Sequence, residues 1–306
     1  MEPRRSPAFA PAAVDRVLLA FLLALALVTA ACVPSPSLLL AAIAAMAASI
    51  VALARWRGRS PLLRTAHAFI AVPVLAALID AVGPAIERLN PRRYDGALAT
   101  IDARFFGPLA HAWRHACGRP DWLTDAASLA YASYYVLPIA CAAILWKQRR
   151  LVEFERLVFS LTTVLLVSYA AYFIAPAAGP RVPPADAQAQ LGGGAISAAL
   201  RAFLRGFERN ELDAFPSGHT ATSLVFLFQA WPMFRRQRYL LAAAVASIVF
   251  STVYLSLHYV IDVVAGAALA ALVAAALRRF APASLESWGA APALPLARPA
   301  RGTLPR

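Results

Sequence analysis

The 306-residue chain is poor in charged residues. Only 15% of its residues are charged, against about 25% in average soluble domains, and 60% are apolar, against about 45–50%. So few charges cannot cover so large an apolar core in water, and the composition therefore indicates a protein whose solvent is lipid. The same composition excludes intrinsic disorder and a collagen-like repeat.

Cysteine is scarce as well. The three cysteines, Cys32, Cys117 and Cys141, lie far apart and form no C-x-x-C pair. Two of them fall in apolar runs, where cysteine commonly serves as a small hydrophobic side chain. A disulfide framework and a cysteine-based metal site are therefore not expected.

Acidic residues are few compared with basic ones. The chain has 16 Asp and Glu against 29 Lys and Arg, which gives a net charge of +13. A basic excess suits nucleic acid, but it also suits anionic phospholipid and cytoplasmic loops. The positions of the charges decide between these partners.

Eight apolar runs are long enough to be considered membrane spans. A bilayer core of about 30 Å needs roughly 20 residues of helix, and the runs are 16–33, 37–54, 66–86, 122–146, 156–175, 217–234, 239–257 and 259–278. The third is the weakest, because Pro73, Asp80 and Gly83-Pro84 interrupt it. The first has an alternative interpretation as a cleaved signal, which the poor fit of Thr29 to a lipobox and the immediate second run disfavour.

The basic residues fall on one side of these runs when the N-terminus is placed inside. The cytoplasmic segments then hold 19 basic and five acidic residues, and the rest of the chain holds ten and eleven. The positive-inside rule therefore predicts an N-in, C-in protein of a bacterial-type inner (plasma) membrane. The net charge then reports topology, and no nucleic-acid partner is expected.

Two long segments fall on the outer side in this topology. Residues 87–121 are not hydrophobic enough to span and predict an interfacial helix with Trp113 at its edge. Its apolar residues at helical spacing are Leu98, Ile101, Phe105 and Leu109. Residues 176–216 are rich in proline and glycine and predict a functional loop, with a short basic helix near 195–209. The Pro- and Ala-rich residues 281–306 predict a disordered cytoplasmic tail.

A histidine and an aspartate lie four residues apart at the start of the last run. Positions i and i+4 share a helix face, so Asp262 can orient the imidazole of His258 and leave its other nitrogen free to attack. An ionisable pair in a span is a functional hypothesis by default, although an interfacial histidine beside a carboxylate is the plainer alternative.

A second group of polar residues lies on the same predicted outer side. In Ser217-Gly218-His219 the glycine permits close approach of a ligand, and the N–H groups of a helix beginning there suit a phosphate. His219 could protonate a leaving oxygen as a general acid, and Arg181 could bind phosphate in bidentate fashion. Taken singly, a helix start and a snorkelling arginine are the plainer interpretations.

Together, Arg181, Ser217-Gly218-His219 and His258 with Asp262 resemble the type 2 phosphatidic acid phosphatase superfamily, the membrane relatives of vanadium haloperoxidases. The resemblance implies an all-α polytopic membrane protein. Its six-helix catalytic core covers residues 66–280, after a basic segment with two additional spans in residues 1–65. It also implies a phosphohistidine at His258 supported by Asp262, protonation of the leaving group by His219, phosphate binding by Arg181, Ser217 and Gly218, and no metal or cofactor.

The chain departs from the family pattern at two cationic positions. Ile174 stands where a lysine is usual, Ser251-Thr252 stands where Ser-Arg is usual, and Val182 follows Arg181. These losses resemble the branch of inositol phosphorylceramide synthase, which transfers a phosphoinositol head group to ceramide. Further likenesses to that branch are Tyr94-Asp95, Ile101-Asp102, Phe106-Gly107, Tyr134-Tyr135 with Pro138, and Gly179-Pro180-Arg181.

We therefore predict a lipid phosphotransferase with a phospholipid or lipid phosphate substrate and a lipid alcohol as acceptor. The same covalent intermediate would serve a lipid phosphate phosphatase, so hydrolysis stays open. Less favoured classes are a transporter, a zinc site formed by His219, His258 and Asp262, and a protease based on Ser217. Arg201, Arg205 and Arg209 repeat every four residues and could contact lipid head groups or form a basic membrane-surface face.

Overall fold

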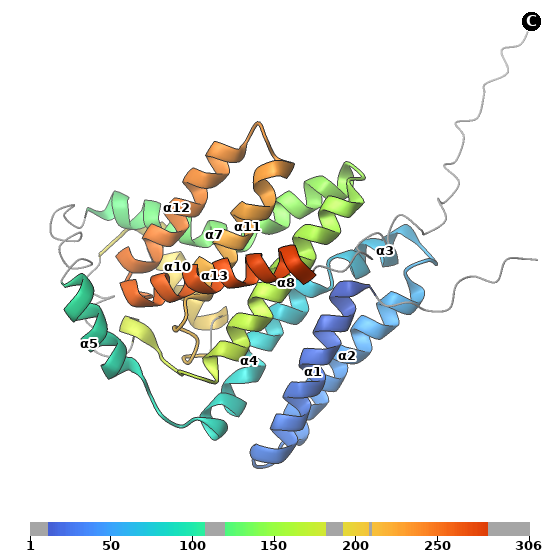
Figure 1. Cartoon of the computed structure of the whole chain (residues 1–306), viewed down its shortest axis with the longest axis horizontal. Helices are drawn as coiled ribbons and strands as arrows, with labels where there is room; N and C mark the ends of the chain where they lie inside the picture. Colours follow the sequence, from blue (N-terminus) through green and yellow to red (C-terminus); the bar gives the residue numbers. More distant parts are fainter. Residues whose placement is uncertain (1–11, 108–119, 182–191, 208–209, 281–306) are drawn as a thin grey trace, which may run out of the picture.

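The structure is a computed structural model that describes residues 12–107, 120–181, 192–207 and 210–280. Within these residues every regular element is a helix (Figure 1), so the predicted all-α, polytopic class is confirmed. In chain order the elements are α1 (Ala13–Cys32), α2 (Ser37–Trp56), α3 (Pro61–Ala68), α4 (Ala71–Leu89), α5 (Asp95–Phe106), α7 (Asp121–Lys147), α8 (Leu151–Tyr172), η1 (Gly179–Arg181), α10 (Ala195–Phe207), α11 (Gly218–Met233), α12 (Arg238–Tyr254) and α13 (Val260–Phe280).

Each of the eight predicted runs coincides with a helix. Five segments of the described chain are long and apolar enough to cross a membrane: α1, α2, the α3–α4 stretch, α7 and α13. The other three runs correspond to α8, α11 and α12, of 22, 16 and 17 residues. Eight crossings, the N-in, C-in topology and the division at residue 65 stay predictions.

The third run is broken, but near its start. α3 ends at Ala68 and α4 begins at Ala71, whereas α4 continues through Gly83-Pro84 to Leu89, so the expected interruption there is wrong. Pro73 lies in the first turn of α4, where its missing N–H costs no hydrogen bond. Five residues before Pro84, the side chain of Asn210 donates to the carbonyl of Ile79, at 3.0 Å. This carbonyl is next to that of Asp80, which Pro84 leaves without its helical donor.

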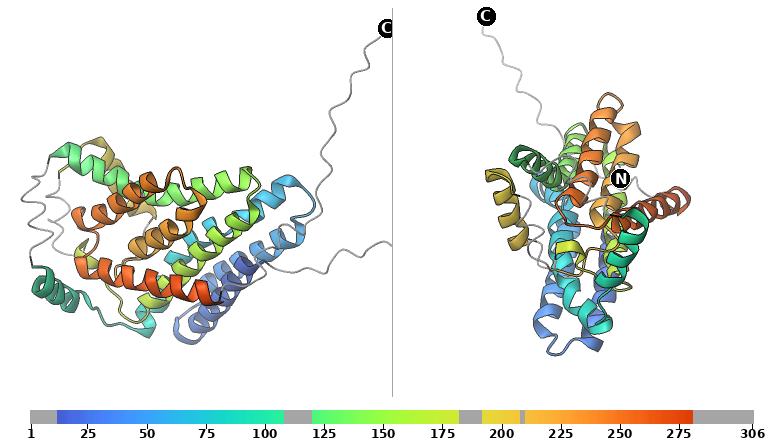
Figure 2. Two further views of the ribbon diagram at one scale, coloured as in Figure 1. Left: turned by 45° about the horizontal axis from the view of Figure 1, so that its top comes forward. Right: turned by 90° about the vertical axis from the view of Figure 1, so that its left-hand side faces the viewer.

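α11 lies at the centre of the bundle and packs against α8, α12 and α13. α1 and α2 form a pair along one edge that packs on α4 and α8, as the views agree (Figures 1 and 2). The close crossing of α11 and α13 depends on Gly266, because a Cβ there would lie 2.5 Å from the carbonyl oxygen of Ser217. The start of α11, which carries His219, is therefore held against α13, which follows His258.

The N-terminal helix pair is also joined to the core by a buried polar contact. The carboxylate of Asp15 accepts a hydrogen bond from the N–H of Ala12 at 2.8 Å and lies 3.1 Å from Nε2 of His67. Both side chains are almost fully buried. The contact fixes the start of α1 against α3.

The segment predicted to hold an interfacial helix contains α5, and its position at a membrane interface stays a prediction. Leu98 is buried, while Ile101 and Phe105 are exposed. The rest of that prediction, Leu109 and Trp113, lies outside the described residues, as do Cys117 and the tail 281–306. The predicted basic helix is α10, which is described to Phe207.

Candidate active site

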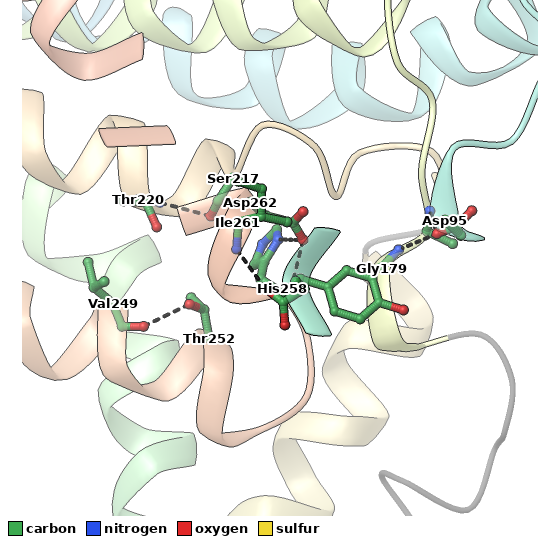
Figure 3. A network of polar contacts seen from close by, with 12 residues as sticks. Asp95, Gly179, Ser217, Thr220, Val249, Thr252, His258, Ile261 and Asp262 are labelled. Atoms are coloured by element: carbon green, nitrogen blue, oxygen red, sulfur yellow. Dashed lines mark hydrogen bonds and ion pairs between the residues drawn. The ribbon is translucent and has the colours of Figure 1, made fainter. Parts of the chain in front are cut away.

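His258 and Asp262 meet at the start of α13, although His258 lies in the bend before the helix and not on the helix face that their spacing predicts. Nδ1 of His258 lies 3.5 Å from Oδ2 of Asp262, and both side chains are buried, with 4% and 0% exposure (Figure 3). The same carboxylate oxygen accepts the N–H of Tyr259 at 2.9 Å. The hydrogen bond from Tyr259 fixes the carboxylate of Asp262 in position. Because Nδ1 of His258 faces this carboxylate, Nε2 lies on the side of the ring away from Asp262.

The backbone between α12 and α13 also fixes His258. The carbonyl oxygen of Thr252 accepts hydrogen bonds from the N–H groups of Leu257 and His258, at 2.9 and 3.0 Å. The hydroxyl of Thr252 donates to the carbonyl of Val249 at 2.7 Å, and its side chain is fully buried. Thr252 therefore holds the loop that carries His258. In the family pattern, a cation stands at the position of Thr252.

The turn before α11 is attached to α13, the helix that follows His258. The N–H of Ser217 donates to the carbonyl of Asp262 at 3.0 Å, and Oγ of Ser217 accepts the N–H of Thr220 at 3.2 Å. Ser217 thus caps α11, and its hydroxyl proton remains available to a ligand. This use of Oγ gives the protease interpretation no support.

Gly218 is required by close packing. A Cβ at this position would collide with the hydroxyl oxygen of Tyr172. As the first residue of α11, Gly218 has no acceptor for its N–H within its own helix. The N-terminal end of α11 can therefore offer an N–H and a positive dipole end to an anion.

His219 lies in the first turn of α11 and is half-buried. Its ring centroid is 5.7 Å from that of His258. The hydroxyl of Tyr131 lies 2.8 Å from its Nε2, and the ring of Tyr134 packs 4.3 Å away. Sequence reasoning missed Tyr131. The only available signal was its position on the face of α7 that also carries Tyr134 and Tyr135.

The loop that carries Arg181 is packed against both histidine segments. Gly179 has a φ of +71°, and a Cβ there would lie 3.0 Å from both the Cβ of Ala214 and the carbonyl oxygen of Leu257. The carboxylate of Asp95 accepts the N–H groups of Ala178 and Gly179, each at 2.8 Å. The backbone of Arg181 therefore ends next to the site, while its side chain lies outside the described residues.

A second aspartate of α5 caps α13. Oδ1 of Asp102 accepts the N–H of Ile261 at 2.9 Å, and the side chain is buried. Burial raises the pKa of Asp102, the Ile261 N–H opposes this, and the nearby carboxylate of Asp262 adds to the increase. The predicted interfacial helix thus has a structural role that the sequence did not reveal, because it fixes both η1 and the start of α13.

Asp102→Asn is expected to be tolerated, because the amide oxygen can still accept the Ile261 N–H. Asp102→Leu should lower the free energy of unfolding by about 1–3 kcal/mol, since a buried N–H loses its acceptor. Because the folded pKa is raised, the stabilising contribution is complete below the ordinary aspartate pKa and is lost as pH rises through the folded value. Thermal unfolding in detergent should therefore show Asp102→Asn gaining on wild type as pH increases. Equal destabilisation by Asn and Leu would contradict this role.

The remaining candidate residues lie at less defined positions. Ile174 is 75% exposed, just before the Arg181 loop. Arg201 donates to the carbonyl of Gly192 at 3.2 Å, whereas the side chain of Arg205 and all of Arg209 lie outside the described residues. Among the residues that the structure describes, no group of three His, Cys, Asp or Glu could hold a metal ion. His219, His258 and Asp262 are not brought together as such a group in the described structure.

Comparison with known proteins gives one match. A family model described as PAP2 superfamily, the type 2 phosphatidic acid phosphatases, matches residues 96–276. This range includes α5, the Arg181 loop and both histidine segments. Neither a curated protein nor a solved structure gives a significant match.

Proposed function

The chain belongs to the PAP2 superfamily, whose members are phosphatases or phosphotransferases, and from this premise we propose that it is a lipid head-group phosphotransferase acting through a phosphohistidine at His258. The observation that carries the proposal is the meeting of His258, Asp262 and His219 at the joined ends of α11 and α13. The inositol phosphorylceramide synthase-like branch is part of the proposal, as is the lipid alcohol acceptor.

The proposed reaction has two steps. Nε2 of His258 attacks phosphorus while the P–O bond to the lipid alcohol breaks, and His219 gives its proton to the departing oxygen. An acceptor hydroxyl then attacks the phosphohistidine, His219 takes the acceptor proton, and the P–N bond breaks. Asp262 stabilises the positive charge of the imidazole in both steps.

The charge of the site favours a phosphodiester. The residues at the two missing cationic positions are an isoleucine and a buried threonine, so Arg181 is the only cation of the family pattern that remains. A phosphomonoester carries about two negative charges at neutral pH, whereas a phosphodiester carries one. With fewer cations, the site matches the singly charged diester group better, as a head-group transferase requires.

Ile174→Lys should shift this preference. A lysine near the Arg181 loop is expected to raise kcat/KM for phosphatidic acid relative to phosphatidylinositol by about 5-fold, which corresponds to about 1 kcal/mol for an exposed charge pair. The neutral variant Ile174→Gln is the matched control. The effect should shrink at high salt because the position is exposed. An equal effect of Lys and Gln would remove the charge argument.

Tyr131→Phe tests how His219 is held. The variant keeps the aromatic packing and removes the hydroxyl that lies 2.8 Å from Nε2. We expect kcat to fall by about 10-fold, the equivalent of one net hydrogen bond, with little change in KM. A change in KM alone, with kcat unchanged, would show that Tyr131 only packs.

The proposed topology places the site at the outer face of the membrane. Its support is the distribution of basic residues: Arg235 and Arg236 follow the far end of α11, a full helix length from His219. The positive-inside rule puts that basic turn in the cytoplasm and the histidines on the opposite side.

The experiment that tests the function uses protein purified in detergent. It is incubated with phosphatidic acid or phosphatidylinositol, each with and without ceramide, and the lipids are followed by mass spectrometry, with His258→Asn as control. We expect acceptor-dependent head-group transfer from phosphatidylinositol. Release of inorganic phosphate from phosphatidic acid, independent of acceptor, would instead identify a phosphatase.

A further inference from the structure

A cavity of about 300 Å³ lies beside His219, and most of its lining comes from α4, α7 and α8. α4 and α7 form two of its walls, and α8, which contacts both, lies between them. The lining is mostly apolar: Val72, Leu75, Ala76, Ile79, Ile139 and Leu165 are typical of it. Val72 and Ile139 are also 39% exposed, so the walls reach the surface that faces lipid in a membrane. The chemistry of this lining fits a hydrocarbon chain.

In the described structure, the cavity is lined by His219 but not by His258. Its described lining includes Gly218 and His219 but neither His258 nor Asp262. In the proposed reaction, His258 keeps the phosphoryl group and His219 protonates the oxygen that departs. The group that departs therefore leaves on the side of the cavity.

We infer that this cavity binds the hydrocarbon chain of the departing lipid alcohol and then, in the second step, that of the acceptor alcohol. The inference rests on the proposed function. In a double displacement, the acceptor oxygen attacks from the side that the first oxygen left, and the residue that gave the proton takes it back. One apolar site beside His219 thus serves both alcohols in turn, and the head group stays on the side of His258.

An aromatic pair lies close to His219 in the lining of the cavity. Phe203 of α10 packs against Tyr135 with ring centroids 5.4 Å apart, and both residues line the cavity. Tyr135 in turn lies 6.2 Å from the ring of His219. The aromatic pair and His219 therefore lie together in the cavity lining, and Val72 of α4 and Ile139 of α7 are exposed residues of this lining, between which a hydrocarbon chain could enter.

The test is photolabelling with a diacylglycerol that carries a diazirine at the end of one acyl chain. We expect labelling of the cavity-lining peptides of α4, α7 and α8, and loss of this labelling when unlabelled dioleoylglycerol or ceramide is added in excess. Ala76→Phe places a ring in the cavity and should reduce the labelling about tenfold, as overpacking would. Ala77→Phe, on the exposed neighbouring position, is the matched control and should change nothing.

Labelling needs no turnover, so the result is independent of whether a substrate has been found. It should also be retained in His258→Asn, which removes the nucleophile outside the cavity. Labelling that excess alcohol does not displace, or that Ala76→Phe and Ala77→Phe affect equally, would overturn the inference. Displacement is measured on wild-type protein, so this experiment can contradict the inference even if Ala76→Phe folds poorly.

Discussion

His258→Asn is expected to lower kcat on the order of 10⁴–10⁶-fold for every lipid substrate. The range is the one that loss of a covalent nucleophile produces in enzymes with a single attacking group. Asparagine keeps a polar group close to the position of Nδ1, so it can still face Asp262, which lies 3.5 Å from the imidazole. It has no group at the position of Nε2 and cannot form the P–N bond.

The choice of asparagine separates chemistry from folding. Alanine would remove the imidazole from beside the fully buried carboxylate of Asp262 and leave it, among the described residues, only the N–H of Tyr259. Loss of the partner of a buried charge destabilises many proteins. His258→Asn should therefore unfold within a few degrees of wild type in the same detergent. Steady-state turnover close to the wild-type rate in a folded His258→Asn protein would remove His258 as the nucleophile.

His219→Ala is expected to have an effect that depends on the leaving group. For a lipid alcohol, which needs a proton to depart, the first step should slow by about 10²–10⁴-fold. For a 4-nitrophenyl phosphodiester, whose phenolate leaves without a proton, the first step should be slowed far less. A burst of nitrophenolate with stopped-flow detection measures this step.

The second step supplies a further check on His219. Deprotonation of the acceptor alcohol also needs His219, so the variant should release one equivalent of nitrophenolate quickly and then turn over slowly. Tyr131→Phe is the comparison, because it keeps the imidazole and should retain turnover. Equal slowing of the burst and of lipid cleavage would contradict a general-acid role.

Local features of the site were accessible from the sequence. The i, i+4 spacing indicated that His258 lies close to Asp262, although His258 lies in the bend before α13 and not on its face. The helix start at Gly218 follows from Ser217 and the apolar run after it. Both predictions concern residues that are close together in the sequence. The role proposed for Ser217 was less complete, because its Oγ also caps the helix through the N–H of Thr220.

Contacts between distant segments were not accessible. Asp102 reaches Ile261 across 159 residues, and Tyr131 reaches His219 across 88. Nothing in the hydrophobic period of α5 or α7 reports which helix lies opposite, because periodicity describes one face and not its partner. The cavity beside His219 is hidden for the same reason, since its walls come from separate helices.

The helix boundaries were also predicted only in part from the sequence. The apolar runs placed the helices, but proline and glycine were poor guides to where α4 would break. Gly83-Pro84 lies inside the helix, where Asn210 donates to the carbonyl of Ile79. Tertiary contacts of this kind override the local preference of proline to end a helix.

The most direct test of the phosphohistidine is to locate the covalent adduct. His219→Ala protein is mixed with the 4-nitrophenyl phosphodiester, quenched in alkali within the burst, digested and examined by mass spectrometry. The proposed mechanism predicts an acid-labile phosphodiester adduct on the peptide that contains His258, and none in His219→Ala protein that also carries His258→Asn. An adduct on another residue, or nitrophenolate release with no adduct on any residue, would contradict it.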